Sequence, residues 1–418
     1  MAAQKKIKHK ELTPEELRWN CDPEIFEFDS TRDIEPIEGI LGQERALKAL
    51  RLGVEIKSPG YNIFISGLSG SGKATAVKKL LERIGTDCPP IKDYAYVNNF
   101  KDPDKPILLI FEKGEATKFK RDFCNSVEIL KTRIPKVLES EAYLERKKKI
   151  VSQYNSKEQE LMNEFDEKLK KQGLTLGKIQ VGEIARPDIL PLINDKPVPV
   201  FQLEEKIKEG VITKEKAQEL INKYNEHQQE LQLVFKKGLK LSQEFQEKLS
   251  ELEKMSTANV IGGVLENLRD KYPADKVKLY LKQVEENILE NIQIFKGLKP
   301  QGETTGDGFT IDYFKEYDVN IVLDNSRTNE CPIIVETSPT YSNLFGMVER
   351  ISDSRGINYS DYTNIKAGSL LQANNGYLVL NVIHLFEEPG VWKTLKRVLT
   401  YNKLEIHDPP TLFQFSYH

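Results

Sequence analysis

A glycine-rich segment between an apolar run and an amphipathic helical pattern constrains this chain more than any other feature. Residues 61–66 are predicted to form a buried strand, residues 67–72 a loop, and the chain from Lys73 onward a helix. Backbone N–H groups of such a loop and the helix N-terminus attract an anion, and the lysine reaches the outer phosphates of a nucleotide. The sequence therefore predicts a loop that binds the phosphates of ATP or ADP. Its members are Gly67, Leu68, Ser69, Gly70, Ser71, Gly72 and Lys73.

The residue after this lysine departs from the usual pattern G-x-x-x-x-G-K-[S/T], in which a hydroxyl group holds magnesium. Ala74 stands at that position, and Thr75 follows one residue later. One residue is about 100° around a helix, so Thr75 is a poor substitute. We expect nucleotide binding here, with Ala74 and Thr75 beside the phosphates and Mg²⁺ only weakly held. The alternative is an ordinary glycine-rich turn between a strand and a helix.

Length and composition exclude several classes of protein. A chain of 418 residues, 39% hydrophobic and 30% charged, is long enough for two or three domains. Its net charge of −3 argues against nucleic-acid binding over the whole surface. No apolar run reaches the roughly 18 residues of a membrane span, and no apolar segment of a secretory signal follows the basic N-terminus. We expect a cytoplasmic protein with no membrane partner.

The cysteines and histidines indicate no metal site. The four cysteines, Cys21, Cys88, Cys124 and Cys331, are far apart and show no C-x-x-C spacing. They are predicted to be reduced and buried, as in a cytosolic protein. The five histidines are scattered. The sequence assigns no metal ligand and no catalytic residue.

The first part of the chain, residues 1–114, alternates short apolar runs with helical patterns. Residues 61–66, 93–100 and 106–111 are predicted strands. Strands separated by helices are typical of a parallel, doubly wound α/β sheet, and this is the predicted fold class.

The second part, residues 115–300, is charged and helical. Two runs of apolar residues at a spacing of three and four predict an antiparallel coiled coil about 60 Å long, and Pro135 should kink or delay its first helix. The first run is Val127, Leu130, Ile134, Val137, Leu144, Val151, Met162, Phe165 and Leu169; the second is Ala217, Ile221, Tyr224, Leu231, Phe235, Phe245, Leu249 and Leu252. Residues 173–210 between them are predicted to form a small β-rich tip.

The third part, residues 301–418, resumes the strand pattern at residues 319–323, 333–335 and 376–380, and a helix is predicted over residues 391–399. We therefore expect one α/β domain that is interrupted by the helical segment. A phosphate-binding loop needs a partner strand that ends in acidic residues, which orient magnesium and polarise the attacking water. The best candidate strand, residues 376–380, is followed by Asn381 and Val382, and neither can supply a carboxylate. A buried core strand without a catalytic role is the alternative.

Taken together, these segments resemble the Lon-related AAA+ proteases, in the branch whose AAA+ module carries a long helical insertion. The resemblance covers residues 11–408. It rests on GILGQERA at 39–46, YVNNF at 96–100 followed by Pro103 and Pro106, NLFG at 343–346, IKAGSL at 365–370, ANNGYLVL at 373–380 and WKTLKR at 392–397.

The resemblance implies an AAA+ unfoldase module that feeds a Ser–Lys protease domain, in a ring of six identical subunits. Gly42 and Gln43 would lie beside the adenine of ATP or ADP, and Asn381 would stand at the acidic position. The helical insertion would help to capture unfolded or damaged proteins. The chain stops at His418, before any nucleophilic serine, sensor residue or arginine finger of the family. We therefore expect no proteolysis and weak ATP hydrolysis from this chain, which is either a fragment or a naturally shortened paralogue.

Four further alternatives stay open at this point. A structural or adaptor protein would bind nucleotide without hydrolysing it. A chromosome-type ATPase with a coiled coil would need an acidic pair and an LSGG-type signature, which the residues after 300 lack. The aromatic residues within 339–346 would either grip substrate in a pore or pack in the core. The basic run at residues 145–149 would either bind a polyanion or form the solvated face of a helix.

Overall fold

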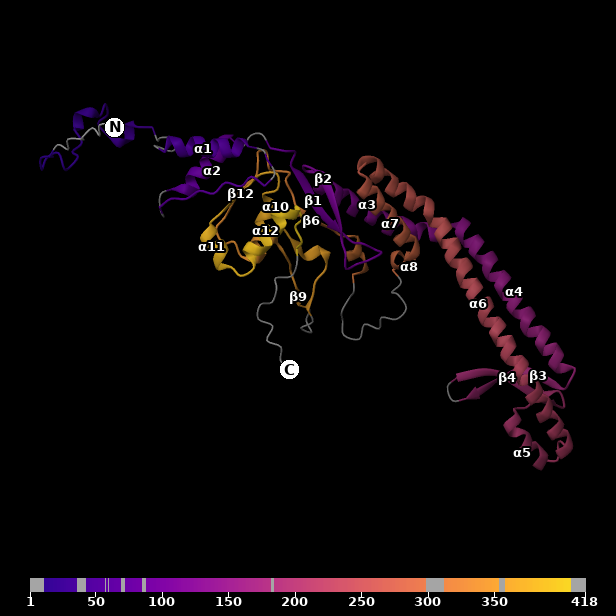
Figure 1. Ribbon diagram of the computed structural model, residues 1–418. Coiled ribbons are helices and arrows are strands. Elements are labelled where there is room, and N and C mark those ends of the chain that lie inside the picture. The colour runs from indigo at the N-terminus through magenta and orange to yellow at the C-terminus, as the bar shows by residue number, and fades with distance from the viewer. Residues whose placement is uncertain are drawn as a thin grey trace, which may run out of the picture. The chain divides into compact units, whose positions relative to one another are not determined.

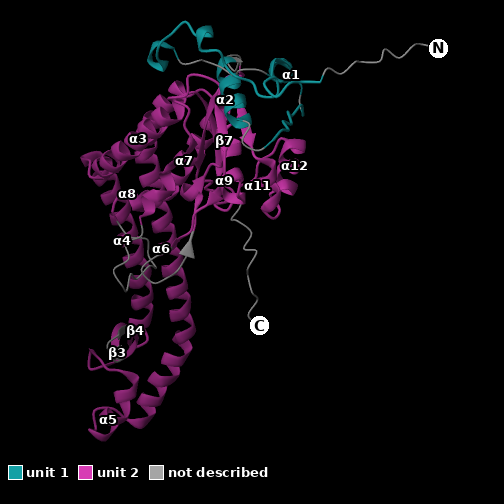
Figure 2. Cartoon of the chain, turned by 90° about the vertical axis from the view of Figure 1, so that its left-hand side faces the viewer, with its two compact units in different colours: residues 1–87 teal, residues 88–418 magenta. Residues whose placement is uncertain are grey.

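The computed structural model describes residues 11–35, 43–56, 58, 60–68, 72–84, 88–181, 184–297, 312–352 and 358–406. The chain divides into two compact units, residues 1–87 and residues 88–418 (Figure 2). Both helices and small sheets are present, which fits the predicted α/β class. The three predicted domains stay a prediction.

Unit 1 contains two regular helices, α1 (Glu44–Glu55) and α2 (Lys73–Ile84), that pack on each other. Val54, Val77 and Leu81 are its buried apolar side chains among the described residues. Two short 3₁₀ turns precede the helices, η1 (Pro23–Ile25) and η2 (Thr31–Asp33). This unit therefore has a small core for its length.

The strand predicted at residues 61–66 is wrong. Residues 61–68 belong to no strand, and Tyr61 and Phe64 are 52% and 76% exposed. The segment has the composition of a buried strand, but a strand forms only beside a hydrogen-bonded neighbour. No described strand pairs with it.

The main sheet of unit 2 has the order β2-β1-β6, with β1 at Lys92–Val97, β2 at Ile107–Glu112 and β6 at Val319–Leu323. The three strands were predicted at these places, but both pairs are antiparallel, so the parallel arrangement is wrong here. The cause is the connection between β1 and β2, residues 98–106, because a parallel crossover needs about a dozen residues or more.

The largest core lies where helices cover this sheet. Helices α3 (Glu115–Leu138), α7 (Asp275–Glu290) and α8 (Ile292–Phe295) pack against the face that carries Ala95, Val97 and Leu109 (Figure 1). Aromatic rings fill the centre of this core. They are Phe111, Phe119, Phe123, Tyr272 and Tyr280, joined by stacked, tilted and edge-to-face contacts.

Two long helices, α4 (Glu141–Lys170) and α6 (Lys214–Lys271), run side by side in opposite directions (Figure 1). We call this pair the arm. Between them lie β3 (Leu174–Val181), β4 (Ile184–Ile193) and β5 (Lys196–Pro197), in an antiparallel sheet of order β3-β4-β5, with η3 (Val200–Gln202) and α5 (Leu203–Lys208). Pro135 lies inside α3, which ends three residues later at Leu138.

A second, parallel pair of strands holds the last part of unit 2. β7 (Ile333–Glu336) pairs with β12 (Tyr377–Leu380), near the predicted positions. Between these two strands the chain forms α9 (Tyr341–Phe345), β8 (Met347–Val348), β9 (Ile351–Ser352), β10 (Asn358–Tyr359), η5 (Tyr362–Asn364), β11 (Ile365–Lys366) and α10 (Ser369–Gln372). η4 (Tyr313–Tyr317) precedes β6, and α11 (Val382–Glu387) and α12 (Val391–Tyr401) follow β12.

The prediction that all cysteines are reduced and buried is wrong. Cys88 and Cys331 form a disulfide, and Cys21 is exposed. Cys124 is free and partly covered, and burial raises the pKa of its thiol. The two bonded residues are 243 positions apart, and sequence spacing alone does not reveal such a pairing. No helix among the described residues is both long and apolar enough to cross a membrane.

Candidate functional site

The predicted phosphate loop leads directly into α2. Gly72 has a φ of 73°, a left-handed conformation that suits glycine, and its carbonyl accepts the N–H of Ala76 at 2.8 Å. Lys73 is the first residue of the helix. Its Nζ donates to the carbonyl oxygens of Gly67 at 2.9 Å and Leu68 at 2.6 Å. Ser69, Gly70 and Ser71 lie outside the described residues.

The start of α2 favours an anion for two reasons. A helix N-terminus carries a partial positive charge from its unpaired N–H groups. The first turn of α2 contains no acidic side chain, and the ammonium group of Lys73 adds a full positive charge. Ala74 and Thr75 follow on the exposed surface of the helix. Ala74 has no hydroxyl group that could ligate magnesium.

The residues predicted beside the adenine are only partly described. Gly42 lies outside the described residues. Gln43 stands immediately before α1 with a φ of 57°, and its side chain does not cap the helix. Its carbonyl accepts the N–H of Leu47 at 3.0 Å, so the residue fixes the first turn of α1 through its backbone.

Asn381 comes directly after β12 and caps the next helix. Its Oδ1 accepts the N–H of Ile383 at 3.1 Å, and Val382 is the first residue of α11. This contact gives Asn381 a structural role at the position where the resemblance expects an acid. Asparagine is among the best N-cap residues, since its side-chain oxygen satisfies a free N–H of the first turn.

A carboxylate that the sequence analysis missed lies at the end of the neighbouring strand. Glu336 is paired in register with Leu380 in the parallel β7–β12 pair. Its Oε1 accepts the N–H of Ser338 at 2.8 Å. Ligands of α/β proteins bind beyond the carboxyl ends of parallel strands. The acidic end of the apolar run 333–335 was the signal that could have identified it.

The motif residues 343–346 and 365–370 meet at a backbone crossing. A Cβ atom on Gly368 would lie 2.4 Å from both Gly346 N and Leu344 O, so only glycine fits there. Ser369 Oγ donates to the carbonyl of Asn343 at 3.1 Å. Phe345 is fully buried, which makes the pore alternative for this aromatic residue wrong.

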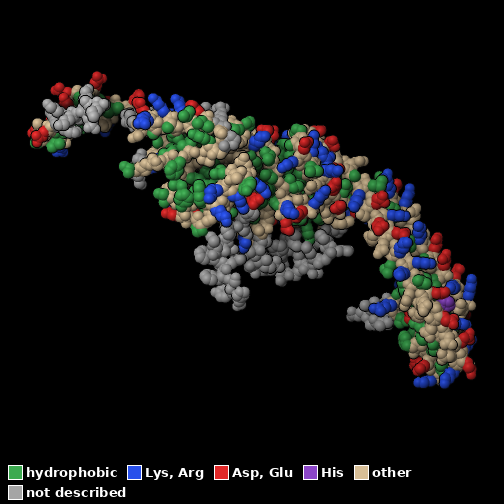
Figure 3. Space-filling model, in the orientation of Figure 1, with side chains coloured by type: hydrophobic (Ala, Val, Ile, Leu, Met, Phe, Trp, Pro, Cys, Tyr) green, Lys and Arg blue, Asp and Glu red, His purple; other side chains and the backbone are tan. Residues whose placement is uncertain are grey.

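The arm carries charges of both signs. Figure 3 shows Lys and Arg side chains interspersed with Asp and Glu along α4 and α6. Lys168 pairs with Glu230 across the two helices at 2.6 Å. The basic run 145–149 lies on α4 and is exposed, as expected of a solvated helix face.

The base of the arm is fixed by a partly buried ion pair. Glu253 of α6 meets Lys296 at 2.6 Å, and the two side chains are 12% and 19% exposed. Tyr143 of α4 donates its hydroxyl to Glu253 at 3.2 Å, and Gln293 Nε2 donates to the same carboxylate at 3.2 Å. Burial and the adjacent Glu253 raise the pKa of Tyr143 to about 12.

A second charged contact joins α3 to the end of α6. Lys271 forms an ion pair with Asp122, and the Tyr272 hydroxyl donates to the same carboxylate at 2.9 Å. The hydrogen bond from Lys271 lowers the pKa of Asp122. Groups of three or more His, Cys, Asp or Glu side chains that could hold a metal ion are absent from the described part of the chain.

Comparison with known families adds two matches. Residues 329–417 match the LonB-like AAA domain, and residues 93–125 match the Lon-like LonC helical domain. The first match includes β7, β12 and the helices after them; the second includes β1, β2 and the start of α3. No curated protein matches the chain. An AAA domain supports nucleotide binding, and the two matches, which together cover less than a third of the chain, support the resemblance to the Lon-related AAA+ family.

Proposed function

We propose that this chain is the nucleotide-binding AAA+ module of a Lon-like ATP-dependent protease and that it engages protein substrates. The observation that carries the proposal is the junction of the glycine loop with α2, where Lys73 lies over the loop carbonyls. The cytoplasm, where such proteases act on unfolded or damaged proteins, is the proposed location. A ring of six identical subunits is the proposed assembly.

ATP or ADP is the proposed ligand, with its phosphates on the loop that begins at Gly67. Lys73 would exchange its two carbonyl acceptors for phosphate oxygens, which are stronger partners because they are charged. The N–H groups of the first turn of α2 would bind the same phosphates. Gly42 and Gln43 are the proposed residues beside the adenine.

We further propose that hydrolysis is slow. Ala74 supplies no magnesium ligand and Val382 no base, while the side-chain oxygen of Asn381 already accepts a helix N–H. Mg²⁺ would be weakly held as a result. Glu336 is the carboxylate that would support any residual magnesium binding, because it stands at the end of the adjacent parallel strand.

Isothermal calorimetry with ADP tests nucleotide binding. Lys73→Ala should weaken ADP binding at least tenfold, because a charge-assisted hydrogen bond is worth about 1.5–3 kcal/mol. Lys79→Ala is the matched control, since Lys79 is an exposed lysine of the same helix. Equal affinity in the wild type and the Lys73 variant would refute the site.

Steady-state ATP turnover tests the hydrolysis proposal. The wild-type rate should lie below the range of about 1–100 per second that is usual for phosphoryl-transfer enzymes. Ala74→Thr combined with Asn381→Asp should raise it, since the pair restores a hydroxyl and a carboxylate. A wild-type rate above about one per second would refute the proposal. Glu336→Gln would then show whether that carboxylate holds the metal.

Protein capture is proposed for the far end of the arm, where Phe201 is 69% exposed beside α5. Exposed aromatic side chains bind unfolded chains through apolar contact. Phe201→Ser in the full chain should weaken binding of a fluorescent unfolded casein at least threefold, as expected for the loss of about 1 kcal/mol. Ile383→Ser, which removes an apolar side chain 64% exposed on α11, is the control. An unchanged casein affinity in Phe201→Ser would contradict this role.

A non-hydrolysing adaptor is the second candidate, favoured by the capping contact of Asn381. It would bind ADP like the first candidate but show no turnover. Turnover that stays undetectable in the Ala74→Thr, Asn381→Asp variant would support the adaptor.

A further inference from the structure

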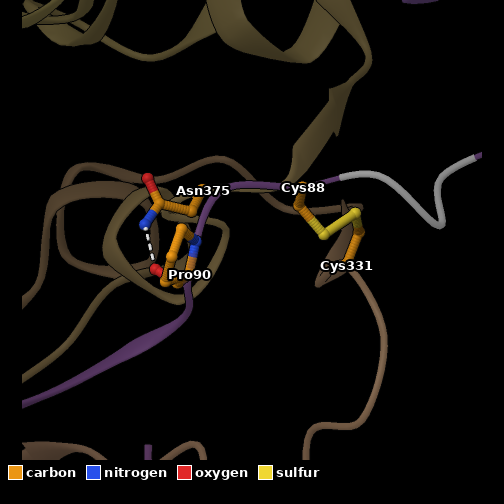
Figure 4. Close-up of a disulfide and its surroundings, with 4 residues drawn as sticks. All are labelled: Cys88, Pro90, Cys331 and Asn375. Atoms are coloured by element: carbon orange, nitrogen blue, oxygen red, sulfur yellow. Dashed lines mark hydrogen bonds between the residues drawn. A yellow bond between two sulfur atoms is a disulfide. The ribbon is translucent and has the colours of Figure 1, made fainter. Parts of the chain in front are cut away.

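Cys88 and Cys331 form a covalent link that the proposed function does not use. Their Cα atoms lie 5.7 Å apart, within the range that a disulfide spans (Figure 4). Cys331 is 6% exposed, whereas Cys88 is only half-buried. Cys88 is therefore the more exposed residue of the pair.

Hydrogen bonds hold the same two stretches of chain together. Asn375 Nδ2 donates to the carbonyl of Pro90 at 2.9 Å, as Figure 4 shows. Asn374 Nδ2 donates to the Tyr94 hydroxyl at 2.6 Å. We call residues 88–94, 331–332 and 374–377 with these contacts the clasp.

On the turn side of the clasp, two stretches of backbone are closely packed. The N–H of Tyr377 donates to the carbonyl of Pro332 at 2.8 Å. A Cβ atom on Gly376 would lie 2.1 Å from that carbonyl oxygen, so the two stretches of backbone are in direct contact. Residues 88–94 are thus joined by the disulfide to a closely packed stretch of backbone.

In sequence, the clasp adjoins both stretches of chain that carry residues of the proposed nucleotide site. Cys88 is four residues after the end of α2 at Ile84, the helix that begins with Lys73. Cys331 is two residues before β7, whose partner β12 ends next to Asn381. The disulfide therefore attaches the chain, four residues after the phosphate-loop helix, to the stretch that precedes β7.

We propose that Cys88 and Cys331 are a reversible thiol–disulfide switch that sets the nucleotide affinity of the phosphate loop. The inference rests on the proposed function. Disulfides in reducing compartments are usually transient and redox-sensing, and the proposed location is such a compartment. Neither free cysteine is expected to exchange with this disulfide. Cys21 lies far away in sequence in unit 1, and burial raises the pKa of the partly covered Cys124.

The chemistry is dithiol exchange with a small or protein dithiol as reductant. A thiolate of the dithiol attacks Sγ of Cys88, the S–S bond breaks, and Cys331 leaves as a thiolate that takes up a proton. The second thiol then attacks the mixed disulfide, releases Cys88 as a thiol, and the reductant becomes a disulfide. Two electrons pass from the reductant to the protein. After reduction the hydrogen bonds of Asn374 and Asn375 remain in the clasp, without the covalent bond.

The test uses the full chain with Cys21→Ser and Cys124→Ser, so that one cysteine pair remains. The protein is oxidised with oxidised dithiothreitol or reduced with dithiothreitol, and the 88–331 cross-link is measured by mass spectrometry of unreduced peptides. Affinity for a fluorescent ADP analogue is then compared. Oxidised protein should bind roughly fivefold more tightly, the lower end of typical coupling between two sites.

Adding Cys88→Ser should give the affinity of the reduced protein under both conditions. If that variant does not fold, the oxidised and reduced forms of the unaltered pair still decide the question. No cross-link under oxidising conditions, or equal ADP affinity in both forms, would overturn the switch.

A second readout separates this inference from the proposed function. Limited proteolysis between Ile84 and Lys92 should be faster in the reduced form, whether or not nucleotide is present. If neither form binds ADP, the nucleotide site is refuted. Cross-linking without any change in proteolysis would overturn the switch alone.

Discussion

Two short segments of similar apolar composition differ in structure: one forms a buried strand and the other forms no strand. Residues 61–66 (YNIFIS) and β1 at Lys92–Val97 (KDYAYV) are both six residues long and rich in aromatic or branched apolar residues. In β1 every second residue is buried between β2 and β6. In residues 61–66 the side chains of Tyr61, Ile63 and Phe64 are at least 42% exposed. The difference shows that composition gives a segment the capacity to form a strand, while neighbouring strands decide whether it does.

The largest test of this comparison is a pair of identical substitutions. Phe123 in the core and Phe64 in the exposed segment are 0% and 76% exposed. Phe123→Ala should lower the free energy of unfolding by about 3–5 kcal/mol, because it leaves a cavity in a packed aromatic cluster. Phe64→Ala should change it by less than about 0.5 kcal/mol. Urea denaturation followed by circular dichroism measures both.

A large effect of Phe64→Ala would break the comparison. It would show that residues 61–66 are buried in solution, as in the strand that the sequence predicts.

A second pair of substitutions compares a covered ion pair with an exposed one. Glu253→Gln at the base of the arm should cost about 3 kcal/mol of stability, because it leaves Lys296 charged and largely covered. Glu82 meets Lys78 of α2 at 3.9 Å with both side chains about half exposed. Glu82→Gln should cost less than about 1 kcal/mol. Thermal and urea unfolding of the two variants would distinguish a buried contact from a surface one, and equal losses would contradict it.

Substitutions at the N-termini of two helices should have smaller effects on stability. Asn381→Ala should lower stability by about 1 kcal/mol, since it removes the acceptor for the N–H of Ile383, whereas Asn381→Asp should be nearly neutral. Gln43→Ala should have little effect, because its side chain does not cap α1. Urea midpoints of the three variants check this, and a destabilising Asn381→Asp would show that the asparagine amide has a further role.

The smallest expected effect is a pH dependence at Asp122. The lowered pKa of this carboxyl, caused chiefly by the hydrogen bond from Lys271, means that its contribution to stability is present above the unfolded value of about 3.9. The contribution is lost as pH falls through the lower pKa of the folded state. Asp122→Asn should therefore reduce the stability difference between pH 6 and pH 3. Urea unfolding at the two pH values measures this stability difference. An unchanged difference in the variant would exclude the Asp122–Lys271 ion pair as its source.

Much of the secondary structure was predictable because local signals agree with tertiary contacts. The strands predicted at residues 319–323 and 333–335 correspond to β6 and β7, and the helix at 391–399 to α12. The antiparallel direction of the strands in the main sheet was not predicted, although the short connection at residues 98–106 was visible in the sequence. The cysteine pairing was beyond sequence reasoning, because it joins residues that only the folded chain brings together.

The candidate site was predictable in part. The glycine loop and Lys73 form a contiguous motif, so local sequence was sufficient to locate them. Glu336 was missed because it lies near Asn381 only once β7 pairs with β12. That pairing places Ile333 beside Tyr377, 44 positions away in the sequence. The buried environment of Phe345 was likewise invisible, because its core is assembled from α9, α11 and α12.

Helix α6 contributes side chains to two separate hydrophobic cores, so a tilt at one core displaces the other. Leu252 packs in the core of the main sheet, and Leu220 packs in the core at the far end of the arm. At a rise of 1.5 Å per residue these positions are about 48 Å apart along one continuous helix. A tilt of about 5° at the base therefore displaces the far end by about 4 Å, which follows from the same helix geometry. A rearrangement around Glu253 and Lys296 that tilts the helix by this angle would therefore move its far end by about the length of a side chain.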